Sequence, residues 1–251
     1  MKVHFNYQIF YQQKIGGISN YYLNLFKELD KLNIDVTLNA PVNIFKDFYK
    51  IKKTFGVNIY SYPKFLKRFF ENLNHIISEK YIEHKQPDIL HNSFYSDKII
   101  KRKGIKNIIT VYDMITELYD KENLNYKNYS IQKKKSIDNS DHIICISENT
   151  KKDLLKIHNI DEKKISIVYL GTNLTEKGNI ELCKDKDFIL YVGSRRGYKN
   201  FENLIKAYSI SKKIRKDLNL VFFGGEKYSS TDSNIIKSYN LEKKKYKIYF
   251  S

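Results

Sequence analysis

The feature that most constrains the fold of this chain is a regular alternation between short apolar runs and longer stretches with helical periodicity. Each apolar run has the length of a single buried strand, and most are followed by a stretch in which apolar residues recur every three or four positions. The alternation predicts an α/β fold with parallel sheets. The predicted strands are 2–6, 34–38, 57–60, 88–91, 107–112, 142–146, 165–169, 188–192, 218–223 and 247–250, and the predicted helices are 18–32, 63–84, 150–157 and one that starts at residue 200.

The periodicity lapses between residues 171 and 187, where the sequence GTNLTEKGNIELCKDKD is rich in polar residues and glycine. Such a stretch is typical of a linker between domains. We therefore predict a first domain over 1–170, a linker over 171–187, and a second domain over 188–251. A doubly wound domain usually needs ~100 residues or more, so we expect the second domain to be truncated.

The charge of the chain favours anionic partners. Lys and Arg number 45 against 28 Asp and Glu, which gives a formal net charge of +17. Nucleic acid, an acidic membrane surface and phosphorylated ligands all suit this balance. The abundance of Lys, Ile, Asn and Tyr also resembles an AT-rich coding bias, which explains most of the charge. The basic residues are scattered and accompany no recognition motif, which argues against nucleic acid.

The two cysteines and the histidines predict no metal site. Cys145 and Cys183 lack metal-ligand spacing, and Cys145 lies in an apolar run as a small hydrophobic residue. The opening sequence MKVHFNYQIF turns polar too quickly for a signal peptide, and no apolar run approaches ~18 residues. We expect a cytoplasmic protein, either free or resting on the inner face of the membrane.

A basic loop between a strand and a helix is the strongest candidate for a binding site. The run 188–192 ends at Gly193, and Arg195, Arg196 and Lys199 follow before a stretch with helical spacing. The N–H groups of a first helical turn, the helix dipole and these cations together favour a phosphate. The alternative is an ordinary strand-to-helix connection with solvated basic residues.

A glycine pair forms a second candidate loop. Gly16 and Gly17 separate the first predicted strand from its helix, where they let the backbone approach a ligand closely. The alternative is a tight turn in which Ser19 is the N-cap. The loop lacks the GxGxxG pattern and an acidic ribose partner, which counts against a nicotinamide or flavin enzyme.

Three further candidates lie at the ends of predicted strands, where ligands of parallel sheets bind. Asp113, after Tyr112, would orient a hydroxyl or balance a charge, or else cap a turn. Ser147 either lines the cleft or caps a helix. His91 either faces an acceptor or is a buried, hydrogen-bonded histidine.

Several of these stretches together resemble one enzyme family. The sequences GGISNYYLNLFKEL, SENTKKDL, VYLG and VGSRRGYKNFENLIKAY are similar to segments of retaining, nucleotide-sugar-dependent glycosyltransferases of the GT-B fold, of the family 4 or group 1 type. Two departures stand out: Ser194 replaces the common Arg after the glycine, and Tyr112 replaces the His of a His-Asp pair. The resemblance implies two Rossmann-like domains and the following roles: donor binding by Gly16, Gly17, Ser147, Gly193, Arg195, Arg196 and Lys199, catalysis by Tyr112 and Asp113, and acceptor binding by His91.

The resemblance also implies an activity. The enzyme would move a sugar from a GDP- or UDP-sugar to a saccharide or lipid-linked acceptor with retention, in the synthesis of cell-surface polysaccharides or glycoconjugates, without a metal or cofactor. The GYKN sequence of the basic loop favours mannose. The segment 64–70, KFLKRFF, would either press on an anionic membrane, as in several family members, or pack as an amphipathic helix with solvated lysines.

Two alternatives stay open. The glutamate pair that the family carries in its distal donor domain is not found in this chain, which favours an inactive or binding-only remnant. A UDP-sugar 2-epimerase of the same fold is the other alternative. The sequence leaves the sugar, acceptor, linkage and oligomeric state open.

Overall fold

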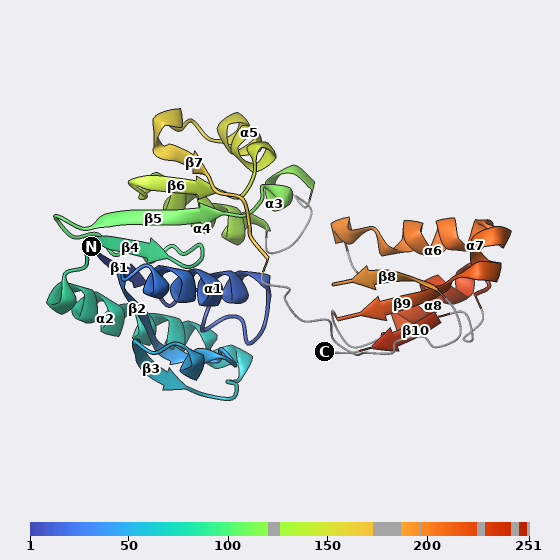
Figure 1. The fold of residues 1–251 in the computed structure, drawn as a ribbon, viewed down its shortest axis with the longest axis horizontal. Helices are drawn as coiled ribbons and strands as arrows, with labels where there is room; N and C mark the ends of the chain where they lie inside the picture. The colour runs from blue at the N-terminus through green and yellow to red at the C-terminus, as the bar shows by residue number, and fades with distance from the viewer. Residues whose placement is uncertain (120–125, 173–186, 196, 225–228, 242–245, 250–251) are drawn as a thin grey trace. The chain divides into compact units, whose positions relative to one another are not determined.

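The structure is a computed structural model that describes residues 1–119, 126–172, 187–195, 197–224, 229–241 and 246–249 (Figure 1). The chain divides into two compact units, Met1–Gly171 and Thr172–Ser251. Most of the predicted linker 171–187 lies outside the described residues.

The first unit is built on a parallel sheet of seven strands in the order β3-β2-β1-β4-β5-β6-β7 (Figure 1). The first six follow the order of a doubly wound dinucleotide-binding fold, in which the chain reverses its winding direction between β1 and β4. The strands are β1 (Lys2–Phe5), β2 (Asp35–Asn43), β3 (Thr54–Asn58), β4 (Ile89–Asn92), β5 (Lys106–Val111), β6 (His142–Cys145) and β7 (Ile165–Ile167).

Helices cover both faces of this sheet, because successive side chains of a strand point to opposite faces. On one face the ring of Phe5 meets the ring of Tyr22 on α1 edge-on, with centroids 5.4 Å apart. On the other face the His4 ring stacks on Tyr81 of α2 at 5.1 Å. The helices of the unit are α1 (Gly17–Lys31), α2 (Lys67–Lys85), α3 (Ile115–Tyr119), α4 (Tyr126–Asp138) and α5 (Glu148–Ile157), with single 3₁₀ turns at Phe48–Lys50, Lys64–Leu66 and Glu162–Lys164.

Strand β2 is longer than its apolar run predicts, and the reason is a bulge. The predicted strand ended at residue 38, but β2 continues to Asn43 through Pro41, and its register with β3 shifts between Asn39 and Val42. A bulge is one of the few places where a sheet tolerates proline. Opposite it, Gly56 has φ +142°, and a Cβ there would lie 1.9 Å from the Ala40 carbonyl oxygen, so this position requires glycine.

The second unit contains a parallel sheet of three strands in the order β10-β9-β8. The core forms on one face, where Ile205 of α6 and Ile236 of α8 pack against Leu220 and Phe222 of β9. Its elements are β8 (Phe188–Val192), a 3₁₀ turn (Gly197–Lys199), α6 (Phe201–Ile210), α7 (Lys212–Asp217), β9 (Asn219–Phe223), α8 (Ser230–Ser238) and β10 (Tyr246–Tyr249). The two parallel sheets with their helices confirm the predicted α/β class.

Candidate active site

The carboxyl edge of the first sheet carries a buried polar network at the reversal point between β1 and β4. The Asn92 side chain, at the end of β4, accepts hydrogen bonds from the amides of Asn6 (3.3 Å) and Gln8 (3.2 Å). The Ser93 hydroxyl donates to the Asn6 carbonyl at 2.6 Å and accepts from the Ile9 N–H at 3.0 Å. Sheets of this kind bind ligands outside this edge. The network therefore fixes the loops that border it.

None of these four polar residues, Asn6, Gln8, Asn92 and Ser93, was singled out from the sequence. Their signal was the position of polar residues at or just after the ends of two predicted strands. That position alone did not distinguish a buried network from ordinary loop residues. The distinction depends on burial, and all four side chains are buried in the structure.

Tyr112 and Asp113 lie directly after β5, at the same edge of the sheet. The Asp113 carboxylate accepts a hydrogen bond from the Ile115 N–H at 3.1 Å, which is the turn-capping role that the sequence left open. Its side chain is half-buried. Burial raises the pKa of Tyr112 well above its ordinary value, so the phenol stays protonated and is a hydrogen-bond donor at neutral pH.

A buried ion pair between Lys133 and Glu117 stabilises the loop that carries Tyr112 and Asp113. Lys133 of α4 is fully buried, and its ammonium group donates to the backbone carbonyl of Asp113 at 2.5 Å and to the Glu117 carboxylate at 3.0 Å. The ring centroids of Tyr95 and Tyr129 lie 5.2 Å and 5.6 Å from the same ammonium group. These contacts connect α3, α4 and the loop after β4, and they hold the backbone at Asp113 in one position.

His91, in β4, lies inside the first unit. Its side chain is buried, its Nε2 is 2.9 Å from the Thr110 hydroxyl, and its ring meets the rings of Phe5 and Tyr22 edge-on. Burial lowers the pKa of His91 to about 3, so its imidazole is neutral. This placement favours the buried, hydrogen-bonded histidine over the acceptor contact, which stays a prediction.

The glycine loop leads into the first turn of α1. Gly16 is the N-cap of this helix, and the Gln13 side chain accepts from the Ser19 N–H at 3.0 Å. The Ser19 hydroxyl donates back to the Gly16 carbonyl at 3.1 Å. Ser19 therefore lies inside the first turn of α1. The predicted alternative in which Ser19 is the N-cap is wrong, because Gly16 has that position. A Cβ added at Gly17 would meet no atom within 4 Å, so the backbone there is open.

Ser147 is the N-cap of α5. Its hydroxyl accepts from the Thr150 N–H at 3.1 Å, and the Thr150 hydroxyl in turn donates to the Tyr112 carbonyl at 3.2 Å. This chain of bonds connects the loop after β6 to the loop after β5. The capping alternative thus describes Ser147 in the structure, and its contact with a donor stays a prediction.

In the second unit, the predicted cations of the basic loop have different environments. Arg195 is buried, with its guanidinium 3.2 Å from the Asp232 carboxylate and 3.1 Å from the Gly224 carbonyl. Lys199 is exposed, at the end of the 3₁₀ turn that precedes α6. Arg196 lies outside the described residues. Gly193 has φ +120° and donates its N–H to the Phe223 carbonyl at 3.0 Å, so the loop starts in a conformation that favours glycine.

The structure thus brings the predicted residues together at two sheet edges. Tyr112, Asp113 and Ser147 follow adjacent strands of the first unit, and Gly193 and Lys199 follow β8 of the second. Among the described residues no group of three or more His, Cys, Asp or Glu side chains is placed to hold a metal ion. No helix in the described part of the chain is both long and apolar enough to cross a membrane.

Comparison with known proteins identifies the family. Residues 15–176 match the sequence model of Glycosyltransferase Family 4, and residues 173–247 match that of the Glycosyl transferases group 1. A curated relative, the O-antigen chain mannosyltransferase RfbU of Salmonella typhimurium, is 27% identical over 118 residues, which are 47% of this chain and 32% of RfbU. The match therefore spans about a third of the length of that relative.

Solved structures share the fold at low sequence identity. Sucrose-phosphate synthase from Thermosynechococcus elongatus superimposes with a TM-score of 0.74 at 14% identity, over 99% of this chain and 70% of that chain. The UDP-GlcNAc 2-epimerase from Methanocaldococcus jannaschii superimposes with a TM-score of 0.61 at 17% identity, over 100% and 73%. A synthase and an epimerase therefore share this architecture, so the fold alone does not identify the reaction. The first family model covers well over half of the residues, so the chain belongs to Glycosyltransferase Family 4.

Proposed function

We propose that this protein is a hexosyltransferase that moves a sugar, with mannose favoured, from a GDP- or UDP-sugar to a saccharide or lipid-linked acceptor with retention of configuration. The observation that carries the proposal is the exposed Lys199 in the loop between β8 and α6, within the part that matches the group 1 transferases. The relation to an O-antigen mannosyltransferase supports mannose and a role in polysaccharide synthesis.

The second unit would bind the donor. Transfer breaks the bond between the anomeric carbon and the diphosphate, and negative charge develops on the departing nucleoside diphosphate. Lys199, together with Arg196, would stabilise that charge, which is why no metal ion is needed in this proposal. Arg195 is already paired with Asp232, so its proposed role is to hold the loop in shape. The Glu202 carboxylate, in the first turn of α6, accepts a hydrogen bond from the Tyr239 hydroxyl at 3.3 Å.

The first unit would bind the reacting sugar and the acceptor. Asp113 would orient a sugar hydroxyl after β5, and the protonated phenol of Tyr112 would supply a hydrogen bond. Gly17 opens the backbone at the start of α1, where N–H groups and the helix dipole favour an anionic group. Ser147 would line the same edge.

The first unit would also contact an anionic membrane in this proposal. Phe65, in the 3₁₀ turn before α2, and Phe69, in the first turn of α2, are 81% and 58% exposed, although an amphipathic helix packed on the sheet would cover such side chains. Lys64, Lys67 and Arg68 lie in the same stretch and line a cavity of about 450 Å³. Exposed aromatics beside cations suit the interface of an anionic bilayer, which a lipid-linked acceptor would occupy.

Donor binding is tested by thermal unfolding of the full chain with GDP, UDP, GDP-mannose and a UDP-hexose. A ligand that binds only the folded state raises the unfolding temperature. We expect a shift with one nucleotide that disappears in Lys199→Ala and persists in Lys206→Ala, an exposed lysine of α6. Transfer of radiolabelled sugar to a lipid extract then reports the acceptor.

The alternative functions predict different results with the same nucleotides and sugar nucleotides. Conversion of a UDP-sugar to its C2 epimer without an acceptor would favour the epimerase. Absence of any nucleotide-dependent shift would favour a non-catalytic remnant.

For the membrane surface, co-sedimentation with vesicles that contain anionic lipid should fall in Phe65→Ser/Phe69→Ser and persist in Tyr49→Ser, an exposed aromatic residue outside this stretch.

A further inference from the structure

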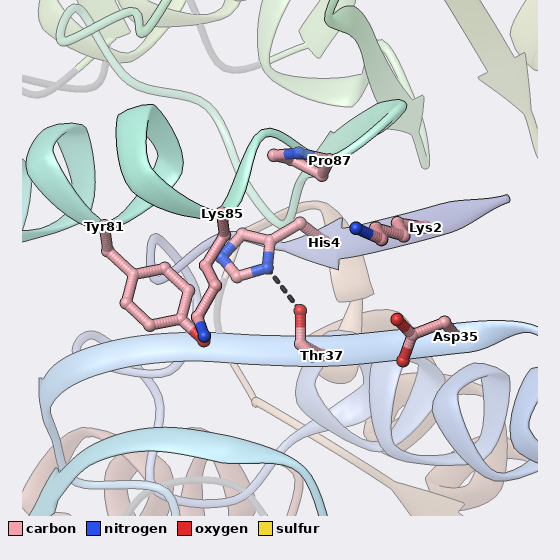
Figure 2. Close-up of a pocket in the computed structure, with 7 residues that line it drawn as sticks. All are labelled: Lys2, His4, Asp35, Thr37, Tyr81, Lys85 and Pro87. Carbon is pink, nitrogen blue, oxygen red and sulfur yellow. Dashed lines mark hydrogen bonds between the residues drawn. The ribbon is translucent and has the colours of Figure 1, made fainter.

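A cavity of about 240 Å³ lies at the amino ends of β1 and β2, the sheet edge opposite to the candidate active site (Figure 2). The strand register places Lys2 beside Asp35 and His4 beside Thr37, so these four side chains share one face of the sheet. The last turns of α2 and the connection to β4 complete the wall. The lining residues are Lys2, His4, Asp35, Thr37, Tyr81, Lys85 and Pro87.

His4 is the buried polar group of this cavity. Its Nδ1 is hydrogen-bonded to the Thr37 hydroxyl, and its ring stacks on Tyr81 (Figure 2). Its other nitrogen, Nε2, is buried and has no hydrogen-bond partner among the described residues. Burial lowers the pKa of His4 to about 4, so the ring is neutral and Nε2 offers one donor or one acceptor. A buried polar atom without a partner is costly, which calls for an explanation.

The polar character continues beyond His4 on the same face. Asn39 follows Thr37 by two residues on β2, and Ser78 precedes Tyr81 by three residues on α2, so strand and helix periodicity place both toward this side. Both are fully buried. Neither the amide of Asn39 nor the hydroxyl of Ser78 has a hydrogen-bond partner within the described part of the chain. A sheet face that packs only against a helix is normally apolar, so this polar layer is better suited to a hydroxyl-rich ligand.

The mouth of the cavity is cationic. Lys2 and Lys85 line it, and the one carboxylate of the lining, Asp35, is 2.9 Å from the ammonium group of Lys53. The charge of Asp35 is thus balanced by a lysine outside the lining, and the two lining lysines leave an excess of positive charge. Such a mouth attracts an anionic group, for which a phosphate between two ammonium groups is suited.

We infer that this cavity is a binding site for a small sugar phosphate. The phosphate would lie between Lys2 and Lys85, and the sugar hydroxyls would bond with Thr37 and with the unpartnered Nε2 of His4. Pockets for larger organic ligands usually have volumes of ~300–1,000 Å³, so a cavity of about 240 Å³ suits a monosaccharide phosphate and is too small to enclose a whole nucleotide sugar. The site is therefore separate from the proposed donor site and does not depend on it.

Calorimetric titration of the full chain with mannose 6-phosphate, mannose and inorganic phosphate tests the inference. We expect saturable binding of the sugar phosphate, at least tenfold weaker binding of each of the other two, and at least tenfold weaker sugar-phosphate binding in Lys85→Met. Lys80→Met removes an exposed lysine of the same helix and should leave the affinity unchanged. Lys199→Ala should also leave it unchanged, although it removes the proposed donor contact.

A second variant tests the buried part of the site. His4→Phe keeps an aromatic ring against Tyr81 and removes both ring nitrogens, so sugar-phosphate affinity should fall at least tenfold while circular dichroism shows an intact fold. The inference would be overturned by no binding, by equal affinity for inorganic phosphate and the sugar phosphate, or by binding that Lys199→Ala abolishes and Lys85→Met leaves intact.

Discussion

The two units build the same kind of parallel sheet but differ in how far the described helices cover it. In the first unit, Leu38 and Ile109 are fully buried in sheet strands. In the second unit, Leu220, Val221 and Phe222 of β9 are fully buried, whereas Leu190 and Val192 of the neighbouring strand β8 are 48% and 62% exposed. Parallel sheets are normally covered on both faces, and each exposed apolar surface forgoes ~25 cal/mol per Å² of stabilisation. We therefore expect the described sheet of the second unit to be the less stable one.

Substitutions in the two buried ion pairs should have the largest effects on stability, and they test whether the two units differ. Lys133→Met leaves the Glu117 carboxylate buried and unpaired, which should lower the free energy of unfolding of the first unit by ~3–5 kcal/mol. Arg195→Met should destabilise the second unit by the same mechanism. Hydrogen exchange in urea, read separately for β5 and β9, reports which unit loses protection.

The control for the first pair is an exposed pair on the same helix. Lys134 and Asp138 of α4 are 61% and 48% exposed, and Lys134→Met should cost less than ~1 kcal/mol. Equal effects of Lys133→Met and Lys134→Met would contradict the stabilising role of the buried pair. Loss of protection in both units from one of these variants would contradict the expectation that each ion pair stabilises only its own unit.

A matched pair of leucine substitutions tests the coverage of the two sheets. Leu38→Ala in β2 removes a fully buried side chain and should cost ~2–5 kcal/mol. Leu190→Ala in β8 removes a side chain that is 48% exposed and should cost less than ~1 kcal/mol. Urea denaturation of each variant gives the two values, and a cost for Leu190→Ala as large as for Leu38→Ala would show that this face of β8 is covered.

A further expected difference between the units is in acid stability, because none of the six histidines lies beyond residue 158. Burial lowers the pKa of His4 to about 4 and of His91 to about 3, whereas an unfolded histidine titrates near ~6.5. The unfolded chain therefore binds protons first as the pH falls. These residues should leave stability unchanged above pH ~6.5 and reduce that of the first unit progressively between pH ~6.5 and these lower values.

Substitution of His91 by Asn should flatten this part of the pH dependence, as measured by urea midpoints at several pH values. The exposed His84→Asn should leave the slope unchanged. If the slope of stability against pH is the same in the wild type and in His91→Asn, the buried imidazole of His91 does not cause the loss of stability in acid.

The strands were predictable from sequence because apolar runs mark buried strands directly, and β8 spans the predicted residues 188–192. Helix α4 was missed because its pattern is inverted. Lys133 is fully buried while Ile131 is 44% exposed, so the apolar spacing that marks a helix face is absent. Sequence periodicity assumes that lysine lies outside, and here the carboxylate of Glu117 and two tyrosine rings reverse that rule.

The candidate site was predictable in position but less so in detail. Gly193 and Lys199 follow a strand, as the sequence pattern predicts, but the inward turn of Arg195 depends on Asp232, which is distant in the chain. Likewise, the burial of His91 depends on Thr110, a residue of the neighbouring strand. Contacts between residues far apart in sequence leave no local signal, so a single sequence does not contain them in readable form.

The pairing of β1 with β4 also has a consequence for the order in which the chain folds. β1 lies between β2 and β4, and the contact between Asn6 and Asn92 joins residues 86 positions apart. Closing a loop of that length costs entropy before any contact compensates for it, and such pairings slow folding. During synthesis, the first strand therefore has one open edge until residue 92 has left the ribosome. We expect this interval to be the period in which the nascent chain is most prone to aggregation.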